Sequence, residues 1–374
     1  MGLVVFVLRP GSIYFRASRE IRKEIMPIFG ASQDLFALTR QLVDINSVTG
    51  NEAEVVQFAG DYLASLGLAV EVMPVSPGRA NLLALQGKPQ VVLSTHLDTV
   101  PPFMPSSEDE ACIYGRGACD AKGIAAAQIM AAKQLLQEGV RDFGVMLLVG
   151  EETSSDGAAT ANLSPRGTQY MVNGEPTENR LALGSKGILR VDLRANGRMA
   201  HSAYPHLGVS AIDKLLDVLA DLRRLALPHD ALLGQATLNI GLIAGGRAAN
   251  VVPDQATAQV LIRTVPQPPG ERPLRSKVED VVAGRCECEF VRETPPMQME
   301  CVDGFATGVV AFTTDLPSLT RWGLPLLIGP GSIHVAHTDH ERVAKAELEE
   351  AVGHYCRLVR ELKNRCRNDA QNRI

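Results

Sequence analysis

The sequence predicts an α/β protein in which a doubly wound mixed sheet is interrupted by an inserted α+β domain. Helical and strand-like segments alternate along residues 31–182, which is the pattern of a sheet with helices on its faces. Around residue 183 the pattern changes to a compact α+β unit, and after about residue 295 it returns to the first pattern. Because one pattern encloses the other, we expect a discontinuous first domain, residues 31–182 and 295–374, around an inserted domain, residues 183–294.

The spacing of apolar residues predicts the elements of the first domain. In "DLFALTRQLVDI" (34–45) and "NEAEVVQFAGDYLASLG" (51–67) apolar residues recur at helical spacing. Three strand-like runs follow between residues 68 and 98. The small-residue segment "IAAAQIMAAKQLLQEG" (124–139) predicts a buried helix, and the continuous apolar run "FGVMLLVG" (143–150) predicts a buried strand. In such a sheet, ligands bind at the carboxyl ends of the strands.

The inserted domain combines alternating strands with a long helical segment. "GILRVDLRANGRMAHS" (187–202) alternates in strand fashion, and "GVSAIDKLLDVLADLRRLAL" (208–227) has helical spacing. Two strand-like runs (236–246 and 254–265) follow, and then a loop at 266–273, because its prolines cannot continue a strand ladder. We expect a ferredoxin-like domain.

The composition excludes several classes of partner. Of the 374 residues, 45% are hydrophobic and 21% are charged, which is typical of a folded protein of about two domains. The net charge of -5 provides no basic field for a phosphate backbone, and no apolar run is long enough to span a membrane. We therefore expect no nucleic-acid partner, no membrane span and a small-molecule substrate.

The cysteines and the amino terminus bear on location and processing. The seven cysteines are odd in number and irregularly spaced, which favours a reducing compartment, so we expect a cytoplasmic protein. Residues 1–30 begin with a short apolar run followed by several arginines, without the order of a secretory leader. We interpret them as an N-terminal extension outside the fold and as a start codon assigned too early, with Met26 as the alternative start.

A histidine and an aspartate stand two positions apart where a predicted strand ends, in "STHLDTVPPF" (94–103). Side chains i and i+2 of an extended segment point the same way, so His96 and Asp98 share one face. This suits a metal site in which one imidazole nitrogen holds the ion and the carboxylate accepts a hydrogen bond from the other. A solvated turn or a capped helix start has the same pattern, so further ligands must decide.

Four further segments place ligand-type side chains where strands pass into loops. In "YGRGACDAKG", Asp120 stands at a helix entrance, where it is either a ligand or an N-cap. Glu151 and Glu152 directly follow an apolar run, and their repulsion is relieved by a cation, by a shared proton or in a solvated loop. Glu175 in "NGEPTENR" and His337 in "GPGSIHVAHTDHE" complete a set of imidazoles and carboxylates at one sheet.

The ordered motifs "STHLDTVP", "GRGACDAKG", "GEET", "GEPT", "AHSAYP" and "GPGSIHVAHTDHE" resemble the co-catalytic zinc family that contains acetylornithine deacetylase, succinyl-diaminopimelate desuccinylase, aminoacylase and carboxypeptidase G. The resemblance covers residues 32–365. It implies that the sheet domain is catalytic. It also implies that the insert, residues 183–294, is a dimerisation and lid domain of a homodimer.

The resemblance implies two zinc ions per subunit, for which cobalt can substitute. His96 and Glu175 would hold one ion, Glu152 and His337 the other, and Asp120 would bridge both. Two such ions lower the pKa of a bridging water and polarise the scissile carbonyl.

The resemblance also implies the roles of the remaining residues. Glu151 would be the general base and Asp98 the partner of His96. The insert's His201 would reach the partner's active site and stabilise the oxyanion. Asn250 and Arg263 would bind substrate.

Gly331, in the glycine loop before His337, is a further residue that we expect to bind substrate. His340, in the same segment, departs from acetylornithine deacetylases, which tend to carry an acidic residue there, so the substrate is less constrained than the reaction.

We expect a di-zinc amidohydrolase that removes a small acyl group from an N-acyl amino acid. The alternative is a metallo-carboxypeptidase or dipeptidase of the same family that acts on short peptides or N-acylglutamate. A third hypothesis is a binding relative that has lost the chemistry. Glu151 argues against it, because a binder needs no unliganded carboxylate beside two metals.

Overall fold

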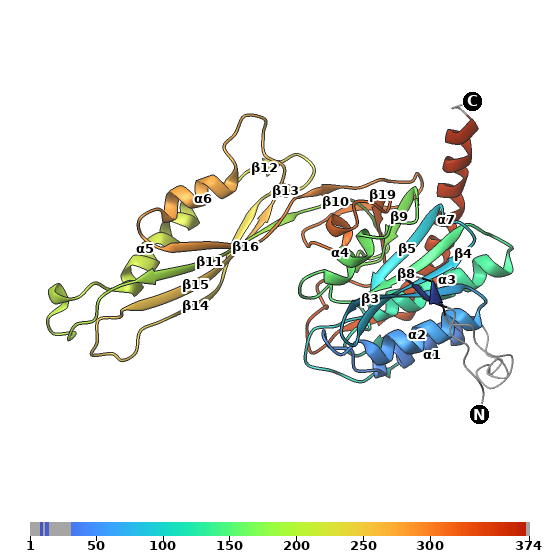
Figure 1. The fold of residues 1–374 in the computed structure, drawn as a ribbon, viewed down its shortest axis with the longest axis horizontal. Helices are drawn as coiled ribbons and strands as arrows, with labels where there is room; N and C mark the ends of the chain where they lie inside the picture. The colour runs from blue at the N-terminus through green and yellow to red at the C-terminus, as the bar shows by residue number, and fades with distance from the viewer. Residues whose placement is uncertain (1–7, 10–11, 15–30, 372–374) are drawn as a thin grey trace. The chain divides into compact units, whose positions relative to one another are not determined.

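A computed structural model of the chain describes residues 8–9, 12–14 and 31–371. Its contacts divide the chain into two units (Figure 1). Unit 1 comprises Met1–Leu183, Met299–Gly308 and Thr314–Ile374, and unit 2 comprises Gly184–Gln298 and Val309–Thr313. The chain therefore passes between the units four times, after Leu183, Gln298, Gly308 and Thr313.

An eight-stranded mixed sheet forms the centre of unit 1. β3 pairs antiparallel with β4 and β4 with β8, whereas β8, β5, β9 and β19 run parallel to one another. In sheet order the strands are β1 (Leu8–Arg9), β2 (Ser12–Tyr14), β3 (Ala69–Ser76), β4 (Arg79–Gln86), β8 (Phe143–Leu148), β5 (Val91–His96), β9 (Tyr170–Asn173) and β19 (Leu324–Leu327). The doubly wound mixed sheet predicted from the sequence is confirmed.

Two short strands at one edge of this sheet, β1 and β2, come from residues 1–30, which were predicted to lie outside the fold. β2 pairs antiparallel with β3, with Ile13 opposite Val72. The rest of residues 1–30 lies outside the described residues, so the N-terminal extension and the alternative start at Met26 stay predictions.

Four helices cover one face of the sheet and enclose the main hydrophobic core. They are α1 (Ala31–Asp44), α2 (Ala53–Ser65), α3 (Lys122–Gln137) and α7 (Lys345–Gln371). α3 packs against both α1 and α7, and α2 packs against β4. Every residue of β5 and β8 is buried, as expected for strands covered on both faces.

The opposite face of the sheet is covered by α4 (Asp156–Asn162). Successive side chains of a strand point to opposite faces, so Asn81 of β4 points away from Leu82, which belongs to the main core. Asn81 Nδ2 donates to the backbone oxygen of Gly157 in α4 (2.8 Å), and the buried Trp322 indole donates to that of Ala161 (3.0 Å). With both faces covered, the loops at the strand ends are left to form a site.

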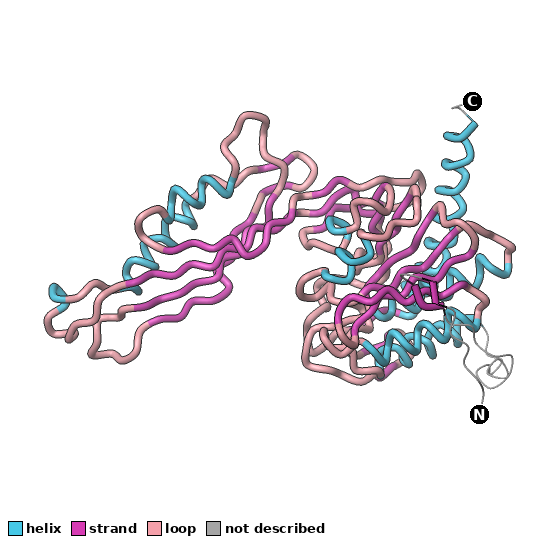
Figure 2. The backbone as a smooth tube through the Cα atoms, in the orientation of Figure 1, coloured by secondary structure: helices cyan, strands magenta, loops and turns pink. Residues whose placement is uncertain are grey.

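Unit 2 is built on a four-stranded antiparallel sheet that carries two helices (Figure 2). In chain order its main elements are β11 (Gly187–Asn196), α5 (Ala211–Arg224), β14 (Thr237–Gly245), β15 (Gln255–Thr264), α6 (Leu274–Val282) and β16 (Glu287–Thr294). The sheet order is β14-β15-β11-β16. This βαββαβ order is the ferredoxin-like arrangement expected of the insert.

Shorter elements complete the two units. They are β6 (Ser107–Glu108), β7 (Cys112–Tyr114), β10 (Leu181–Ser185), η2 (Pro205–Leu207), β12 (His229–Asp230), β13 (Gly234–Gln235), β17 (Met297–Gln298), β18 (Thr307–Val310), η3 (Leu316–Ser318) and β20 (Arg342–Ala344). In the part of the chain that the structure describes, no helix combines the length and apolarity needed to cross a membrane. No disulfide joins any of the seven cysteines, all of which lie in the described part of the chain.

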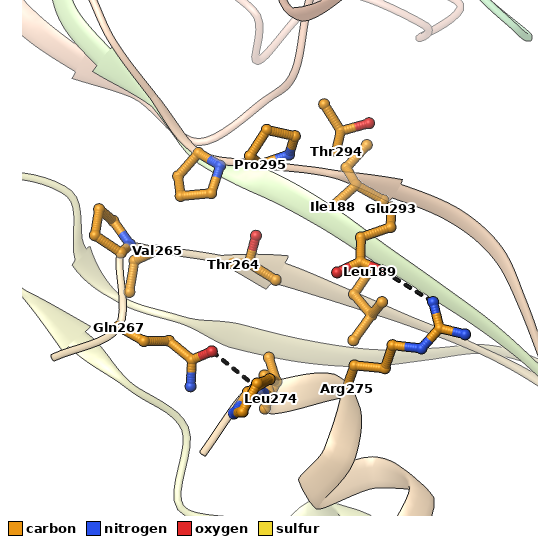
Figure 3. A pocket seen from close by; sticks show the side chains of 13 residues that line it. Ile188, Leu189, Thr264, Val265, Gln267, Leu274, Arg275, Glu293, Thr294 and Pro295 are labelled. Carbon is orange, nitrogen blue, oxygen red and sulfur yellow. Dashed lines mark hydrogen bonds and ion pairs between the residues drawn. The ribbon is translucent and has the colours of Figure 1, made fainter. Parts of the chain in front are cut away.

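A pocket of about 270 Å³ lies in unit 2, beside the start of α6 (Figure 3). Its polar groups engage one another: Arg275 Nη1 lies 3.2 Å from Glu293 Oε2, and Gln267 Oε1 accepts a hydrogen bond from the Leu274 N–H (2.9 Å). The lining includes none of the residues that the sequence assigns to chemistry. The predicted ligands lie elsewhere, at the strand ends of unit 1.

Candidate metal centre

The edge of the unit 1 sheet collects the predicted ligands that follow its parallel strands. His96 is the last residue of β5, Glu151 and Glu152 follow β8, and Glu175 follows β9. β5 lies between β8 and β9 and is parallel to both, so the carboxyl ends of the three strands meet at one edge. The continuous apolar strands thus deliver four polar side chains to one place.

Two groups of three side chains are each arranged to hold a metal ion. His96, Asp120 and Glu175 form the first group, and Asp120, Glu152 and His337 form the second. Within each group the ligand atoms lie within 4.8 Å of one another. Asp120 belongs to both groups, and a carboxylate with two oxygens is suited to bridging two ions.

The two imidazoles approach different oxygens of the shared carboxylate. His96 Nε2 lies 3.0 Å from Asp120 Oδ1, and His337 Nε2 lies 3.3 Å from Asp120 Oδ2. His96 Nε2 is also 3.9 Å from Glu175 Oε2, and His337 Nε2 is 3.0 Å from Glu152 Oε2. Each ring nitrogen therefore faces two carboxylates, one shared and one of its own.

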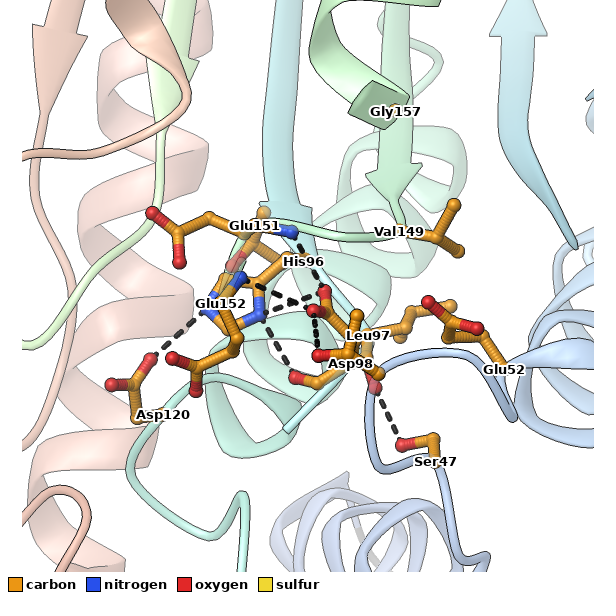
Figure 4. A network of polar contacts seen from close by, with 12 residues as sticks. Ser47, Glu52, His96, Leu97, Asp98, Asp120, Val149, Glu151, Glu152 and Gly157 are labelled. Carbon is orange, nitrogen blue, oxygen red and sulfur yellow. Dashed lines mark hydrogen bonds and ion pairs between the residues drawn. The ribbon is translucent and has the colours of Figure 1, made fainter. Parts of the chain in front are cut away.

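Asp98 supports both His96 and the turn that carries the two glutamates (Figure 4). His96 Nδ1 lies 2.9 Å from the Asp98 backbone oxygen and 3.5 Å from its carboxylate, which leaves Nε2 for the ligand group. The buried carboxylate also accepts the N–H groups of Glu151 (3.1 Å) and Glu152 (3.2 Å) and the hydroxyl of Thr49 (2.8 Å). Sequence reasoning identified the contact with His96 and missed the contacts with the turn.

Glu151 belongs to neither ligand group. In Figure 4 its carboxylate lies on the same side of the strand end as Asp120. Burial raises the pKa of Glu151 well above its ordinary value, and the charges of Asp315 and Asp120 contribute to the rise. A carboxylate with a raised pKa is suited to accept and release a proton during catalysis.

The charges of the site fit divalent cations. Glu175 Oε1 is buried and has no hydrogen-bond partner among the described residues, which is costly for a carboxylate oxygen. Burial raises the pKa of Glu175 well above its ordinary value, and hydrogen bonds to Asp120 and Glu152 raise the pKa of His337 to about 10. The site thus favours positive charge, and its mixture of imidazole and carboxylate ligands suits zinc and related ions.

His337 occupies an unusual backbone conformation. Its φ of 63° lies in the left-handed region, which costs a residue with a Cβ roughly 1–2 kcal/mol. Such strain is retained where the surrounding structure holds a functional side chain in place. We infer that the strained backbone of His337 is retained because it places the ring between Asp120 and Glu152.

Two of the predicted residues of unit 2 are neighbours. His201 forms an isolated bridge with Val251, and the Ser202 N–H donates to the backbone oxygen of Asn250 (3.0 Å). His201 and Asn250 are both exposed. His201 follows the carboxyl end of β11, and Asn250 follows the carboxyl end of β14. Both strands end at the same end of the sheet.

Arg263 lies at the other end of the same sheet. It pairs with Ile188 at the start of β11, and its Nη1 donates to Thr313 Oγ1 (3.3 Å). The structure therefore does not bring Arg263 together with His201 and Asn250 within unit 2. The catalytic and substrate-binding roles of these three residues stay predictions.

Gly331 is tightly enclosed in the loop before His337. With φ at 83°, it lies in the left-handed region, and an added Cβ would stand 2.5 Å from Cys119 Sγ. Its N–H donates to Glu347 Oε2 (3.0 Å), and its carbonyl accepts the N–H of Glu178 (2.8 Å). Glycine is thus required for packing here, and its binding of substrate stays a prediction.

Further polar residues close to the ligands were given no role from the sequence. Arg116 and Glu341 are buried and form an ion pair between the two loops that carry Asp120 and His337. The buried Asp315 contributes to the raised pKa values of the site. Arg116 and Glu341 stand inside motifs already quoted, which is the one indication of them that the sequence offered.

The chain is similar to peptidases along most of its length. The model of a family described as a peptidase dimerisation domain matches residues 183–295. A peptidase M20 domain-containing protein of Schizosaccharomyces pombe is 39% identical over 342 residues, which cover 88% of this chain and 85% of that protein. A probable carboxypeptidase of Aspergillus terreus is 36% identical over 365 residues, which cover 86% of this chain and 84% of that protein.

Solved structures share the fold. The crystal structure of a tripeptidase from Staphylococcus aureus aligns with a TM-score of 0.75 at 21% identity, and the alignment covers 88% of this chain and 98% of that one. The family resemblance of the six motifs is confirmed by the sequence relatives. The chain belongs to the peptidase M20 family and is a metal-dependent hydrolase.

Proposed function

We propose that the chain is a two-zinc hydrolase that releases the carboxy-terminal amino acid from short peptides. The observation that carries this proposal is the Asp120 carboxylate, which belongs to two ligand groups, while Glu151 belongs to neither. This is the division of residues that hydrolysis of an amide needs, with one set to bind metal and one carboxylate left to move a proton.

The roles of the residues follow from this division. Two bound zinc ions supply Lewis-acid activation of a water and of the amide carbonyl. Glu151 takes a proton from the water as the water oxygen bonds to the carbonyl carbon. It delivers this proton to the amide nitrogen as the carbon–nitrogen bond breaks, so the products are a carboxylic acid and an amine. Asp98 holds Glu151 in place through the Glu151 N–H.

Arg263 is the residue that we propose to bind the free carboxylate of the substrate. It is half-buried and is fixed on one side by Thr313. A guanidinium forms a planar fork that matches the two oxygens of a carboxylate. Recognition of a terminal carboxylate agrees with relatives that are named probable carboxypeptidases.

An N-acyl amino acid deacylase is the second candidate. It releases the same kind of amine, an amino acid with a free carboxylate, and differs only in the acyl group. The loop "GPGSIHVAHTDHE", which resembles that of acetylornithine deacetylase, favours this candidate.

Metal removal and a small substrate set test the proposal. Chelator-treated protein is expected to be inactive and to regain activity with about two equivalents of Zn²⁺ or Co²⁺ per chain, because two ligand groups are present. A dipeptide with a free carboxylate should be hydrolysed much faster than the same dipeptide with a carboxy-terminal amide. Full activity of metal-free protein contradicts the proposal, and faster hydrolysis of N-acetyl amino acids selects the deacylase.

We assign catalysis to unit 1 and homodimer formation to unit 2, which contains most of the match to a peptidase dimerisation domain. β14 is the terminal strand of the unit 2 sheet, and its Leu242 and Ile243 are 63% and 54% exposed. A nine-residue edge strand with exposed apolar side chains is a template for pairing with a second chain. Pairing of two such edges gives a symmetric interface.

Substitution of the β14 edge is expected to dissociate the dimer. Leu242→Lys places a charge where the second copy would cover an apolar side chain, and the unpaired charge opposes association. Sedimentation should show a dimer for the wild type and a monomer for the variant. Leu163→Lys is the control, because Leu163 is 75% exposed in unit 1. A dimer of unchanged strength in Leu242→Lys would exclude this edge as the interface.

A further inference from the structure

Glu341 and Arg116 form a buried ion pair beside the candidate metal centre. Glu341 is 0% exposed and Arg116 is 2% exposed, and Arg116 Nη1 lies 2.6 Å from Glu341 Oε2. Neither residue belongs to a ligand group. A buried ion pair is weak support for stability, because removing two charges from water costs about as much as their attraction returns. A contribution to stability therefore does not explain why this ion pair is buried beside the ligand groups.

The second oxygen of Glu341 binds the backbone of the loop that ends at the shared ligand. Glu341 Oε1 accepts the N–H groups of Gly117 (2.9 Å), Cys119 (3.2 Å) and Asp120 (3.1 Å). Three backbone groups that converge on one oxygen fix the path of this loop. The last of these N–H groups belongs to Asp120 itself. Glu341 therefore fixes the backbone position of the residue that carries the bridging carboxylate.

Arg116 and the Glu341 backbone connect this loop to the one that carries the second histidine. Arg116 Nη1 also donates to the backbone oxygen of Thr338 (3.2 Å), the residue after His337. The Gly115 N–H donates to the backbone oxygen of Glu341 (3.1 Å). The loop that carries Asp120 and the loop that carries His337 are therefore joined by these two hydrogen bonds as well as by the ion pair.

We propose that Glu341, with Arg116, is a positioning residue that sets the bridging ligand Asp120 and the second-site ligand His337 at the separation that two metal ions require. The proposal rests on the metal centre proposed above. Glu341 does not touch substrate or metal, since Arg116 and three backbone N–H groups occupy its carboxylate. Asp120 belongs to both ligand groups, so loss of this support weakens the binding of both metal ions.

The test is a measurement of zinc affinity in the Glu341→Gln variant. Gln is close in size, but it has one acceptor oxygen in place of two. It therefore cannot accept the backbone N–H groups and pair with the Arg116 guanidinium at the same time. Competition with a zinc chelator should show a fall in affinity at both sites of about tenfold to a hundredfold, the range found when groups that orient metal ligands are removed. The same measurement on Arg116→Lys, which keeps the charge, should show a smaller fall.

A control separates positioning from general stability. Glu71 is a buried glutamate of β3 that pairs with Arg166 and belongs to neither ligand group. Glu71→Gln should lower the melting temperature of zinc-free and zinc-loaded protein equally. Glu341→Gln should in addition reduce the rise in melting temperature that zinc produces, because ligands stabilise in proportion to their affinity.

The outcomes distinguish this proposal from the proposed function. If the wild type fails to bind two zinc ions, the proposed metal centre is wrong. If the wild type binds two ions and Glu341→Gln binds both with unchanged affinity, or with no greater loss than Glu71→Gln, the positioning role alone is wrong. Should Glu341→Gln not fold, the result for Arg116→Lys decides, and unchanged zinc affinity in that variant overturns the proposal.

Discussion

Glu151→Gln is expected to retain both metal ions and to lose at least a hundredfold in kcat. The amide keeps the size of the side chain but cannot take a proton from water, and a general base contributes about 10²–10⁴-fold to the rate. Metal binding should survive because Glu151 stands outside both ligand groups. The measurement is kcat on the best substrate, together with zinc content by elemental analysis.

Glu152→Gln provides the matched control, since it removes the adjacent carboxylate with the same chemistry. Glu152 lies 3.0 Å from His337 Nε2 in the second ligand group, so this variant should lose zinc from one site. If instead Glu151→Gln loses zinc and Glu152→Gln keeps both ions with a low kcat, the roles of the two residues are reversed.

His201→Ala is expected to lower kcat/KM by about 10²–10³-fold, or about 3 to 4 kcal/mol of transition-state stabilisation, which is typical of one oxyanion donor. Zinc content should not change, because His201 lies in unit 2 and outside both ligand groups. His206→Ala is the control: His206 is an exposed histidine in the same loop, 6.3 Å from the ring of Tyr204. Near-wild-type activity of this variant shows that the loop tolerates loss of an imidazole.

Mixed dimers test whether His201 serves the partner subunit. When inactive His201→Ala subunits exchange with inactive Glu151→Ala subunits, about half of the dimers are mixed, and each has one site with both residues intact. The recovered activity should therefore approach about a quarter of the wild type. No recovery, with exchange demonstrated by labelled subunits, means that His201 acts within its own chain or has no role in catalysis.

Several candidate ligands could be predicted because they directly follow buried strands. The fully buried runs of β5 and β8 end abruptly in His96 and in the Glu151–Glu152 pair, and a polar group directly after a buried strand is conspicuous in a sequence. Parallel strands then bring these ends to one edge without further information. The α+β character of the insert was predicted from spacing in the same way.

The supporting contacts could not be predicted because they join distant parts of the chain. Arg116 and Glu341 are separated by 225 positions, and nothing in either local sequence indicates the other. Asp98 was expected to serve His96 alone, but its carboxylate also reaches the backbone of Glu151, 53 positions away. Such contacts depend on how loops from different strands approach one another, which apolar periodicity does not encode.

The four passages of the chain between the units limit how the protein can be re-engineered. Unit 2 includes Val309–Thr313, beyond its long segment Gly184–Gln298. In the short segment Val309–Thr313, Thr313 Oγ1 accepts a hydrogen bond from Arg263. The same hydroxyl donates a hydrogen bond to the backbone oxygen of Lys186, which precedes β11 (3.1 Å). Suppose that only Gly184–Gln298 is exchanged with the corresponding segment of a related protein. The residue at position 263 and Thr313 would then come from different proteins, and their hydrogen bond would no longer be matched. Chimeras should therefore exchange both segments together, with their boundaries at the four crossing points.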